Sequence, residues 1–179
     1  MLGALNKVRV EPGDALYVPG GIPHAIGEGV LLVELQEPSD LSVWLEWHGY
    51  AVDAERDGHL GLGLERALEA VDRTGWDARR LATLGVGTTR VEGPPGVRNL
   101  LPAEAEPYFR AEWLRARGRA AVLEPEFSIL VVLDGEGCLA TRGGEMRLGR
   151  GDAVLIPFGA GETTVSGHLD AVRCLPPAA

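Results

Sequence analysis

The stretch GDALYVPGGIPHAIGEG, residues 13–29, combines turn-forming residues with a single histidine. It holds five glycines, two prolines and His24, one of only four histidines in the chain. Apolar runs at residues 15–18 and 30–35 lie on either side of the Pro-Gly-Gly part. The pattern therefore predicts a strand, a turn that carries His24, and a second strand.

Similar runs occur at residues 8–10, 127–133 and 153–156, most of them ending at Gly or Pro. Short apolar runs with Gly and Pro between them are typical of all-β sandwiches and barrels. After residues 127–133, the sequence DGEG (134–137) predicts the turn of a hairpin. We therefore expect an all-β protein.

Two stretches have a helical pattern. Residues 60–76 place apolar side chains at helical spacing and predict a helix. Residues 103–116 are ambiguous, because Pro107 interrupts them and the remainder could form a strand. Residues 85–102 are rich in turn formers and predict a connection between two β units.

An internal repeat supports two β units. Gly13-Asp14-Ala15 is followed after three residues by Pro19, and Gly151-Asp152-Ala153 is followed after three residues by Pro157. Each copy predicts a strand that begins at a Gly-Asp turn and ends at a Pro turn. Glu162 stands in the second copy where His24 stands in the first.

The composition excludes several classes of function. The formal net charge of −9 argues against a nucleic-acid-binding surface, which needs a basic face. No uninterrupted apolar stretch approaches 18 residues, and residues 1–10 lack a signal-peptide pattern, so neither a membrane span nor secretion is expected. Two cysteines do not form a disulfide framework, which favours the cytoplasm.

The segment Gly13-x5-Pro19-x-Gly21-x2-His24 resembles the second motif of the cupin superfamily, whose jelly-roll barrels bind a metal through inward-facing side chains. The longer stretch from residue 13 to residue 40, with Glu34, Gln36 and Ser39-Asp40 after the histidine, is similar to the corresponding part of type I mannose-6-phosphate isomerases. The resemblance covers nearly the whole chain, but only the C-terminal part of the family's length.

The resemblance implies an aldose–ketose isomerase that acts on sugar phosphates with a zinc ion. His24 falls on the family's last metal ligand, and the other ligands would lie in an upstream motif that twelve residues cannot hold. Glu34 and Gln36 share one face of the predicted strand and would either line the barrel near His24 or face solvent. Trp44 stands where the family's short form carries an arginine, and either contacts the sugar ring or packs in the core.

We therefore expect cupin barrels, one complete and one incomplete. Residues 1–50 would form the C-terminal part of a first barrel, 51–99 a helical connector, and 100–179 a complete, metal-free second barrel. Unpaired strand edges in the first barrel predict a homodimer. The sequence ALNKVRVEPGD (4–14) resembles the interior of a longer protein. The alternative function is a non-catalytic cupin that binds a sugar or serves as an assembly partner.

Overall fold

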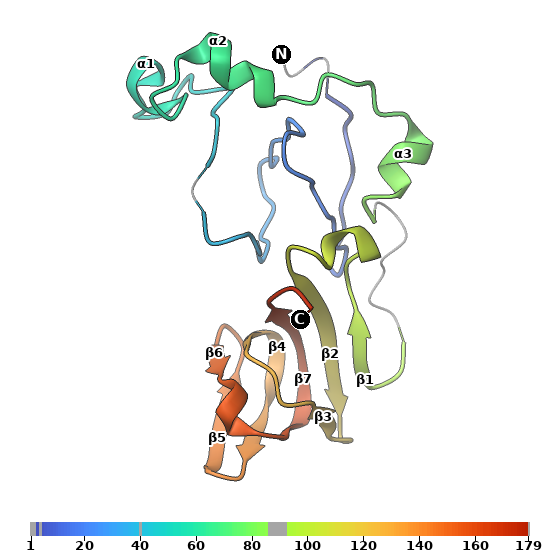
Figure 1. Cartoon of the computed structure of the whole chain (residues 1–179). Helices are drawn as coiled ribbons and strands as arrows, with labels where there is room; N and C mark the ends of the chain where they lie inside the picture. Colours follow the sequence, from blue (N-terminus) through green and yellow to red (C-terminus); the bar gives the residue numbers. More distant parts are fainter. Residues whose placement is uncertain (1–2, 4, 40, 86–92, 179) are drawn as a thin grey trace. The chain divides into compact units, whose positions relative to one another are not determined.

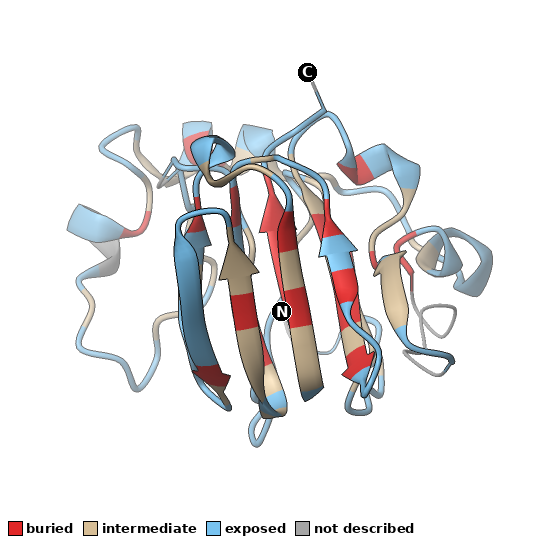
Figure 2. Ribbon diagram, turned by 90° about the horizontal axis from the view of Figure 1, so that it is seen from below, coloured by how far each residue is buried: buried red, intermediate tan, exposed pale blue. Residues whose placement is uncertain are grey.

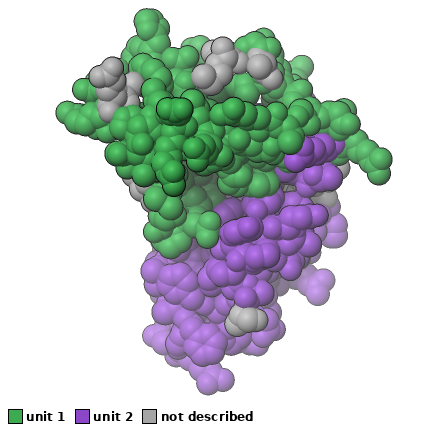
Figure 3. Space-filling view, turned by 45° about the horizontal axis from the view of Figure 1, so that its top comes forward, with its two compact units in different colours: residues 1–9, 18–79 green, residues 10–17, 80–179 purple. Residues whose placement is uncertain are grey.

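The computed structural model describes residue 3 and residues 5–39, 41–85 and 93–178. The chain forms two compact units (Figures 1 and 3). Unit 1 consists of Met1–Arg9 and Val18–Arg79, and unit 2 of Val10–Tyr17 and Arg80–Ala179. The units differ in their secondary structure, since every strand of the described residues belongs to unit 2.

Unit 2 is built on an antiparallel sheet of seven strands among the described residues. The strand order is β1-β2-β7-β4-β5, while β3 pairs with β7 and β6 pairs with β4. The strands are β1 (Gly96–Asn99), β2 (Arg110–Arg117), β3 (Ala121–Leu123), β4 (Ser128–Thr141), β5 (Gly144–Gly149), β6 (Ala153–Ile156) and β7 (Thr163–Leu175). The predicted all-β character is confirmed for this unit.

The core of unit 2 lies on one face of the sheet. In the first half of β4 the side chains alternate, with Leu130 and Val132 buried and Ile129 exposed, as a strand with one packed face requires. Leu114 on β2 and Leu169 on β7 are fully buried against them. Figure 2 shows the buried positions as bands along the strands. The apolar run predicted at 127–133 is thus a core strand.

The sequence DGEG (134–137) does not form a hairpin turn. Residues 134–137 lie inside β4, where the register against β7 shifts between Val132 and Asp134. Gly135 has a φ of 82°, and a Cβ on Gly137 would lie 2.1 Å from the Ser166 carbonyl oxygen. The predicted hairpin turn is therefore wrong: the strand continues through a β-bulge between Val132 and Asp134, and Gly135 and Gly137 allow the close approach of β4 to β7. The hairpin between β4 and β5 turns instead at residues 142–143.

The ambiguous stretch at residues 103–116 resolves into two elements. A 3-10 turn, η3 (Ala103–Ala105), precedes Pro107, and β2 begins at Arg110. The connection predicted at 85–102 holds strand β1, which pairs with β2, and its residues 86–92 lie outside the described residues. A second 3-10 turn, η4 (Phe158–Ala160), follows β6.

Unit 1 contains short helices joined by turns. They are α1 (Ala54–Asp57), α2 (Leu64–Ala67) and the 3-10 turn η2 (Leu68–Ala70); α3 (Ala78–Ala82) spans the point where the chain enters unit 2. The helix predicted over residues 60–76 is much shorter, because Leu60, Gly61 and Gly63 all have positive φ and Val71 is extended. No helix of the described residues is long and apolar enough to cross a membrane.

The strands predicted at residues 8–10, 15–18 and 30–35 are not formed. None of the described residues before Gly96 takes part in a β-ladder. A strand is stable only when a neighbour accepts and donates its backbone hydrogen bonds, and the described residues supply no such neighbour here. The apolar pattern is present, but its partner strands are absent from the described part of the chain.

Candidate functional site

The turn that carries His24 is fixed inside unit 1 by a backbone contact. The Asp72 N–H donates to the Gly21 carbonyl at 2.7 Å, and Gly21 has a φ of 82°. A Cβ at Gly21 would lie 2.7 Å from the Ala70 carbonyl oxygen. Both the positive φ and the close approach require glycine at this position. The second glycine of the Pro-Gly-Gly sequence therefore seats the turn against residues 70–72.

His24 is exposed and has one defined hydrogen bond. Its Nδ1 lies 2.9 Å from the Ile22 carbonyl oxygen. Because a carbonyl only accepts, this contact requires the proton on Nδ1, and in the neutral imidazole it leaves the lone pair of Nε2 available. Metal-binding histidines are commonly oriented by such a bond from the second ring nitrogen. The side chain thus has the tautomer of a ligand.

The other predicted site residues are exposed. Glu34 and Gln36 lie in the unpaired segment after the turn, and Trp44 is 42% exposed with its backbone N–H donating to the Gly58 carbonyl at 2.9 Å. Within the described residues, no group of three or more His, Cys, Asp or Glu side chains could hold a metal ion. The structure therefore shows the turn and the position of His24, but the described residues do not place further metal ligands around this histidine.

Glu46, two residues after Trp44, has a lowered pKa. Its carboxylate accepts hydrogen bonds from the backbone N–H groups of His48 at 2.9 Å and Trp47 at 3.1 Å. These bonds favour the charged form and lower the pKa of Glu46, with the His48 bond the larger cause. Glu46 is thus ionised at neutral pH and shapes the turn after the Trp-Leu-Glu-Trp sequence.

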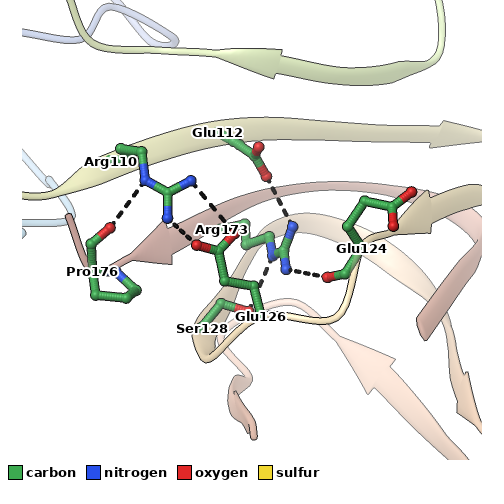
Figure 4. Close-up of polar contacts among 7 residues, drawn as sticks. All are labelled: Arg110, Glu112, Glu124, Glu126, Ser128, Arg173 and Pro176. Atoms are coloured by element: carbon green, nitrogen blue, oxygen red, sulfur yellow. Dashed lines mark hydrogen bonds and ion pairs between the residues drawn. The ribbon is translucent and has the colours of Figure 1, made fainter. Parts of the chain in front are cut away.

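A buried polar cluster, which the sequence pattern did not reveal, lies in unit 2 around Arg173 of β7 (Figure 4). The Arg173 guanidinium donates from Nε to Ser128 Oγ at 3.0 Å and from Nη1 to Glu112 Oε2 at 3.2 Å. Its Nη2 donates to the Glu124 carbonyl at 2.9 Å. The side chain is 4% exposed. Each guanidinium nitrogen has a partner inside the protein, so the cluster ties three segments together and leaves no free charge for a ligand.

A second ion pair lies beside this cluster. Arg110 donates to the Glu126 carboxylate and, from Nε, to the Pro176 carbonyl at 3.0 Å (Figure 4). Arg173 continues the row of inward-facing residues that includes Leu169 and Ala171. The sequence does contain a feature that could have revealed this cluster. Arg173 is the single charge in the apolar run AVRCL (171–175), and it lies two residues after Ala171, a core position. A charge at a core position of a strand requires such partners.

Unit 2 also carries an open concavity of about 700 Å³ over β4, β5 and β7. Its polar lining residues are Glu136, Cys138, Glu145, Arg147 and His168. The Cys138 thiol lies 3.9 Å from Glu145 Oε2. None of His24, Glu34, Gln36 and Trp44 lines this concavity, which belongs to the sheet alone.

Comparisons with known proteins agree with this fold. A family model described as "Mannose-6-phosphate isomerase, cupin domain" matches residues 87–176. The chain is 27% identical over 170 residues to mannose-6-phosphate isomerase ManA of Bacillus subtilis, covering 94% of this chain and 50% of that protein. It is 27% identical over 159 residues to a mannose-6-phosphate isomerase of Streptococcus mutans, covering 86% of this chain and 45% of that protein. The chain thus spans about half the length of these relatives.

Solved structures support the fold. The mannose 6-phosphate isomerase of Salmonella typhimurium, bound to f6p and zinc, superposes with a TM-score of 0.50 at 16% identity, over 64% of this chain and 27% of that protein. A zinc-bound mannose 6-phosphate isomerase gives a TM-score of 0.51 at the same identity and the same coverage. The family match, extending across the whole sheet from β1 to β7, shows that this chain belongs to the mannose-6-phosphate isomerase cupin-domain family.

Proposed function

We propose that this chain is the C-terminal part of a zinc-dependent sugar-phosphate aldose–ketose isomerase of the mannose-6-phosphate isomerase type. The observation that carries the proposal is the family match over residues 87–176. The curated relatives add support, because they align with up to 94% of this chain over about half of their own length. The activity of the whole enzyme would need zinc ligands beyond the described residues. We therefore propose that this chain alone is an incomplete form of the enzyme.

His24 is the proposed contribution of this chain to the zinc site. A catalytic zinc takes about three protein ligands, and a neutral imidazole with a free Nε2 fits one of these positions. The described residues do not make a complete zinc site by themselves. No step of the reaction is therefore assigned to the metal.

Glu34, Gln36 and Trp44 are the proposed contacts to the substrate. A carboxylate and an amide can both hydrogen-bond to sugar hydroxyls, and an indole offers an apolar face to a sugar ring. All three side chains are exposed, which leaves them accessible to a ligand. The segment of residues 41–47 has Trp44 in place of a fixed positive charge, so this proposal includes no arginine at the phosphate.

The proposed architecture follows the resemblance. Residues 1–50 are the C-terminal part of a first cupin barrel, residues 51–99 a helical connector and residues 100–179 a second barrel without metal. Two copies of the chain are proposed to associate, because residues 30–33 are apolar, exposed and without a β-ladder. Two cysteines without a disulfide, Cys138 and Cys174, favour the cytoplasm.

The test measures zinc binding and turnover on the same protein. We expect His24→Ala to weaken zinc binding at least tenfold in competition with a chromophoric chelator, because the substitution removes the proposed ligand. His48→Ala is the matched control, since His48 is exposed in the same unit and holds no proposed ligand position. Conversion of mannose 6-phosphate is measured on the wild-type chain with added zinc.

Equal zinc binding by the wild type and both variants would contradict the proposal, because His24 would then hold no zinc; absence of conversion by this chain alone would not, because the chain is proposed to be incomplete. The alternative, a non-catalytic cupin, would then be supported by mannose 6-phosphate that binds without turnover. Isothermal titration calorimetry with mannose 6-phosphate, on the wild type and on Trp44→Ala, measures whether the sugar phosphate binds and whether Trp44 contributes to its binding.

A further inference from the structure

Residues 10–17 belong to unit 2, although the chain on either side of them belongs to unit 1. We call this segment the strap. Tyr17 is its one buried residue, at 6% exposure, while the residues before it are exposed or half-buried. None of the strap residues pairs in a β-ladder. The strap therefore contributes a single buried side chain to unit 2.

Tyr17 packs on two other aromatic rings of unit 2. Its ring centroid lies 6.5 Å from that of Tyr108, in a stacked arrangement, and 6.1 Å from that of Phe109, in an edge-to-face arrangement. The Tyr17 N–H also donates to the carbonyl of Leu84, a buried residue, at 2.8 Å. Aromatic pairs in such arrangements add stabilisation beyond the area that they bury. The site therefore fits a planar ring better than an aliphatic side chain.

Tyr108 and Phe109, which form the aromatic notch that receives Tyr17, are held by a turn of unit 2 itself. Their backbone N–H groups donate to the Ala105 carbonyl at 2.9 and 3.0 Å. Ala105 is fully buried, and strand β2 begins directly after this turn, at Arg110. None of these bonds involves a strap residue. The backbone of the notch therefore does not depend on the strap for its geometry.

We propose that the strap is a conformational switch, which opens and closes on unit 2 as one piece and is kept closed by the Tyr17 ring in the aromatic notch. A segment with few buried contacts opens at a lower free energy than the core of its domain. Strands β4 and β7, by contrast, pair with each other along most of their length and carry much of the buried core. The strap is therefore expected to open while the sheet stays folded. Opening releases the chain directly before Val18, where it continues into unit 1.

The first test measures hydrogen exchange of the residue-17 N–H in the full-length chain by NMR. In the wild type this N–H is expected to be protected, but roughly tenfold or more below the best protected N–H groups of β4 and β7. Its exchange should also depend little on low concentrations of urea, as local opening requires. Tyr17→Ala is expected to reduce this protection by roughly tenfold to a hundredfold, because the buried side chain and its ring contacts are lost.

Tyr17→Phe and Tyr50→Ala are the control variants. Tyr17→Phe keeps both rings in contact and is expected to retain the protection within about threefold of the wild type. Tyr50 is 72% exposed in unit 1, and its replacement by alanine is expected to change nothing at residue 17. Unchanged protection of β4 and β7 shows that each variant is folded.

The second test removes the ring contact from the side of the notch. Tyr108 is 48% exposed, so that Tyr108→Ala opens no large cavity in the core. We expect this variant to reduce the protection of the Tyr17 N–H as well. Because the two rings touch each other, the double variant Tyr17→Ala/Tyr108→Ala should lose less protection than the two single effects combined.

An unprotected Tyr17 N–H in the wild type would show that the strap is not closed. Protection equal to that of β4 and β7, with the same urea dependence, would show that the strap does not open by itself. Either result overturns the proposal, as do wild-type protection in Tyr17→Ala and strictly additive effects of the two alanine substitutions.

A loss of protection in Tyr17→Phe as large as that in Tyr17→Ala also overturns the proposal, because the hydroxyl and not the ring would then hold the strap. None of these measurements involves zinc or a sugar phosphate. Failure here therefore leaves the isomerase proposal to its own experiment, and the reverse also holds.

Discussion

The two copies of the repeat begin with the same turn. The Asp14 carboxylate accepts a hydrogen bond from the Glu11 N–H at 2.8 Å, and the Asp152 carboxylate accepts one from the Gly149 N–H at 2.7 Å. In each copy the aspartate N–H also donates to the carbonyl three residues earlier, at 3.0 Å. Gly13 and Gly151 have φ values of 93° and 92°. The local sequence thus produces one geometry twice.

The residues after the turn behave differently in the two copies. Residues 153–156 form β6, which pairs with β4, and Ile156 is 4% exposed in the core. Residues 15–18 form no ladder, and Tyr17 is held instead by its N–H donating to the Leu84 carbonyl at 2.8 Å and by ring contacts with Tyr108 and Phe109. The difference is the presence of β4 beside the second copy.

This comparison shows that a turn is a local property and a strand is not. The side-chain and backbone bonds of the Gly-Asp turn join residues three apart. A ladder joins residues far apart in sequence, and forms only where the partner strand is available. The predictions below test the two copies and the sheet that contains the second, from the largest expected effect to the smallest.

The largest effect is expected at Arg173, whose cluster fixes β7 to β2 and to the segment before β4. Arg173→Met should lower the free energy of unfolding by about 3–5 kcal/mol, because it leaves buried acceptors without their donor. Urea unfolding followed by tryptophan fluorescence measures the change. Arg142→Met, an exposed arginine in the β4–β5 turn, is the control. A loss of less than about 1 kcal/mol, as for a surface pair, would show that the cluster contributes little.

The matched pair Ile156→Ala and Val18→Ala compares the two copies at equivalent positions. Ile156→Ala should lower the free energy of unfolding by about 2–4 kcal/mol, because it opens a cavity in the core. Val18 is only half-buried and lacks a ladder, so its substitution should cost less than about 1 kcal/mol. The same urea experiment measures both. Equal losses would mean that the first copy is packed as tightly as the second.

The matched pair Asp152→Ala and Asp14→Ala compares the shared turn. Asp152→Ala should cost about 1 kcal/mol, because the lost hydrogen bond positions β6. Asp14→Ala should cost less than about 0.5 kcal/mol, a value typical of surface substitutions, because no strand depends on that turn. Thermal unfolding of the two variants shows which of them loses more stability. A larger loss of stability for Asp14→Ala than for Asp152→Ala would contradict the interpretation that no strand depends on the turn in the first copy.

The smallest effect concerns thiol chemistry inside the sheet. Burial raises the pKa of the Cys174 thiol, while Cys138 is partly exposed at the concavity. Only the thiolate reacts with a disulfide reagent, so at pH 8 the partly exposed Cys138 should react before the buried Cys174, and the rate at Cys174 should keep rising as the pH increases above 8. Release of thionitrobenzoate measures the rates, with Cys138→Ser isolating Cys174. Equal rates at pH 8 would mean that β7 opens readily.

The same raised pKa has a consequence for stability. Because the folded-state pKa of Cys174 lies above its unfolded value, the folded protein holds this proton more tightly. Its contribution is fully present below the unfolded pKa and is lost as the pH rises through the folded value. The stability of unit 2 should therefore fall in the alkaline range, and less so in Cys174→Ala.

The sequence by itself determined the two Gly-Asp turns, the apolar runs and the family. Asp14, Asp152 and the glycines before them specify their turns through bonds within four residues, and the run at 153–156 became β6 at the predicted bounds. His24 could be placed after a Pro-Gly-Gly turn for the same reason. Such features depend on near neighbours, which a sequence displays directly.

The tertiary structure alone decided which apolar runs became strands. Residues 30–35 and 153–156 have similar composition, yet only the second run lies beside a partner such as β4. It also decided that β4 has a bulge between Val132 and Asp134 and that Arg173 is buried with Glu112 and Ser128. These outcomes depend on residues that lie far apart in sequence, because a ladder, a close strand approach and a buried charge each require a partner supplied from elsewhere in the fold.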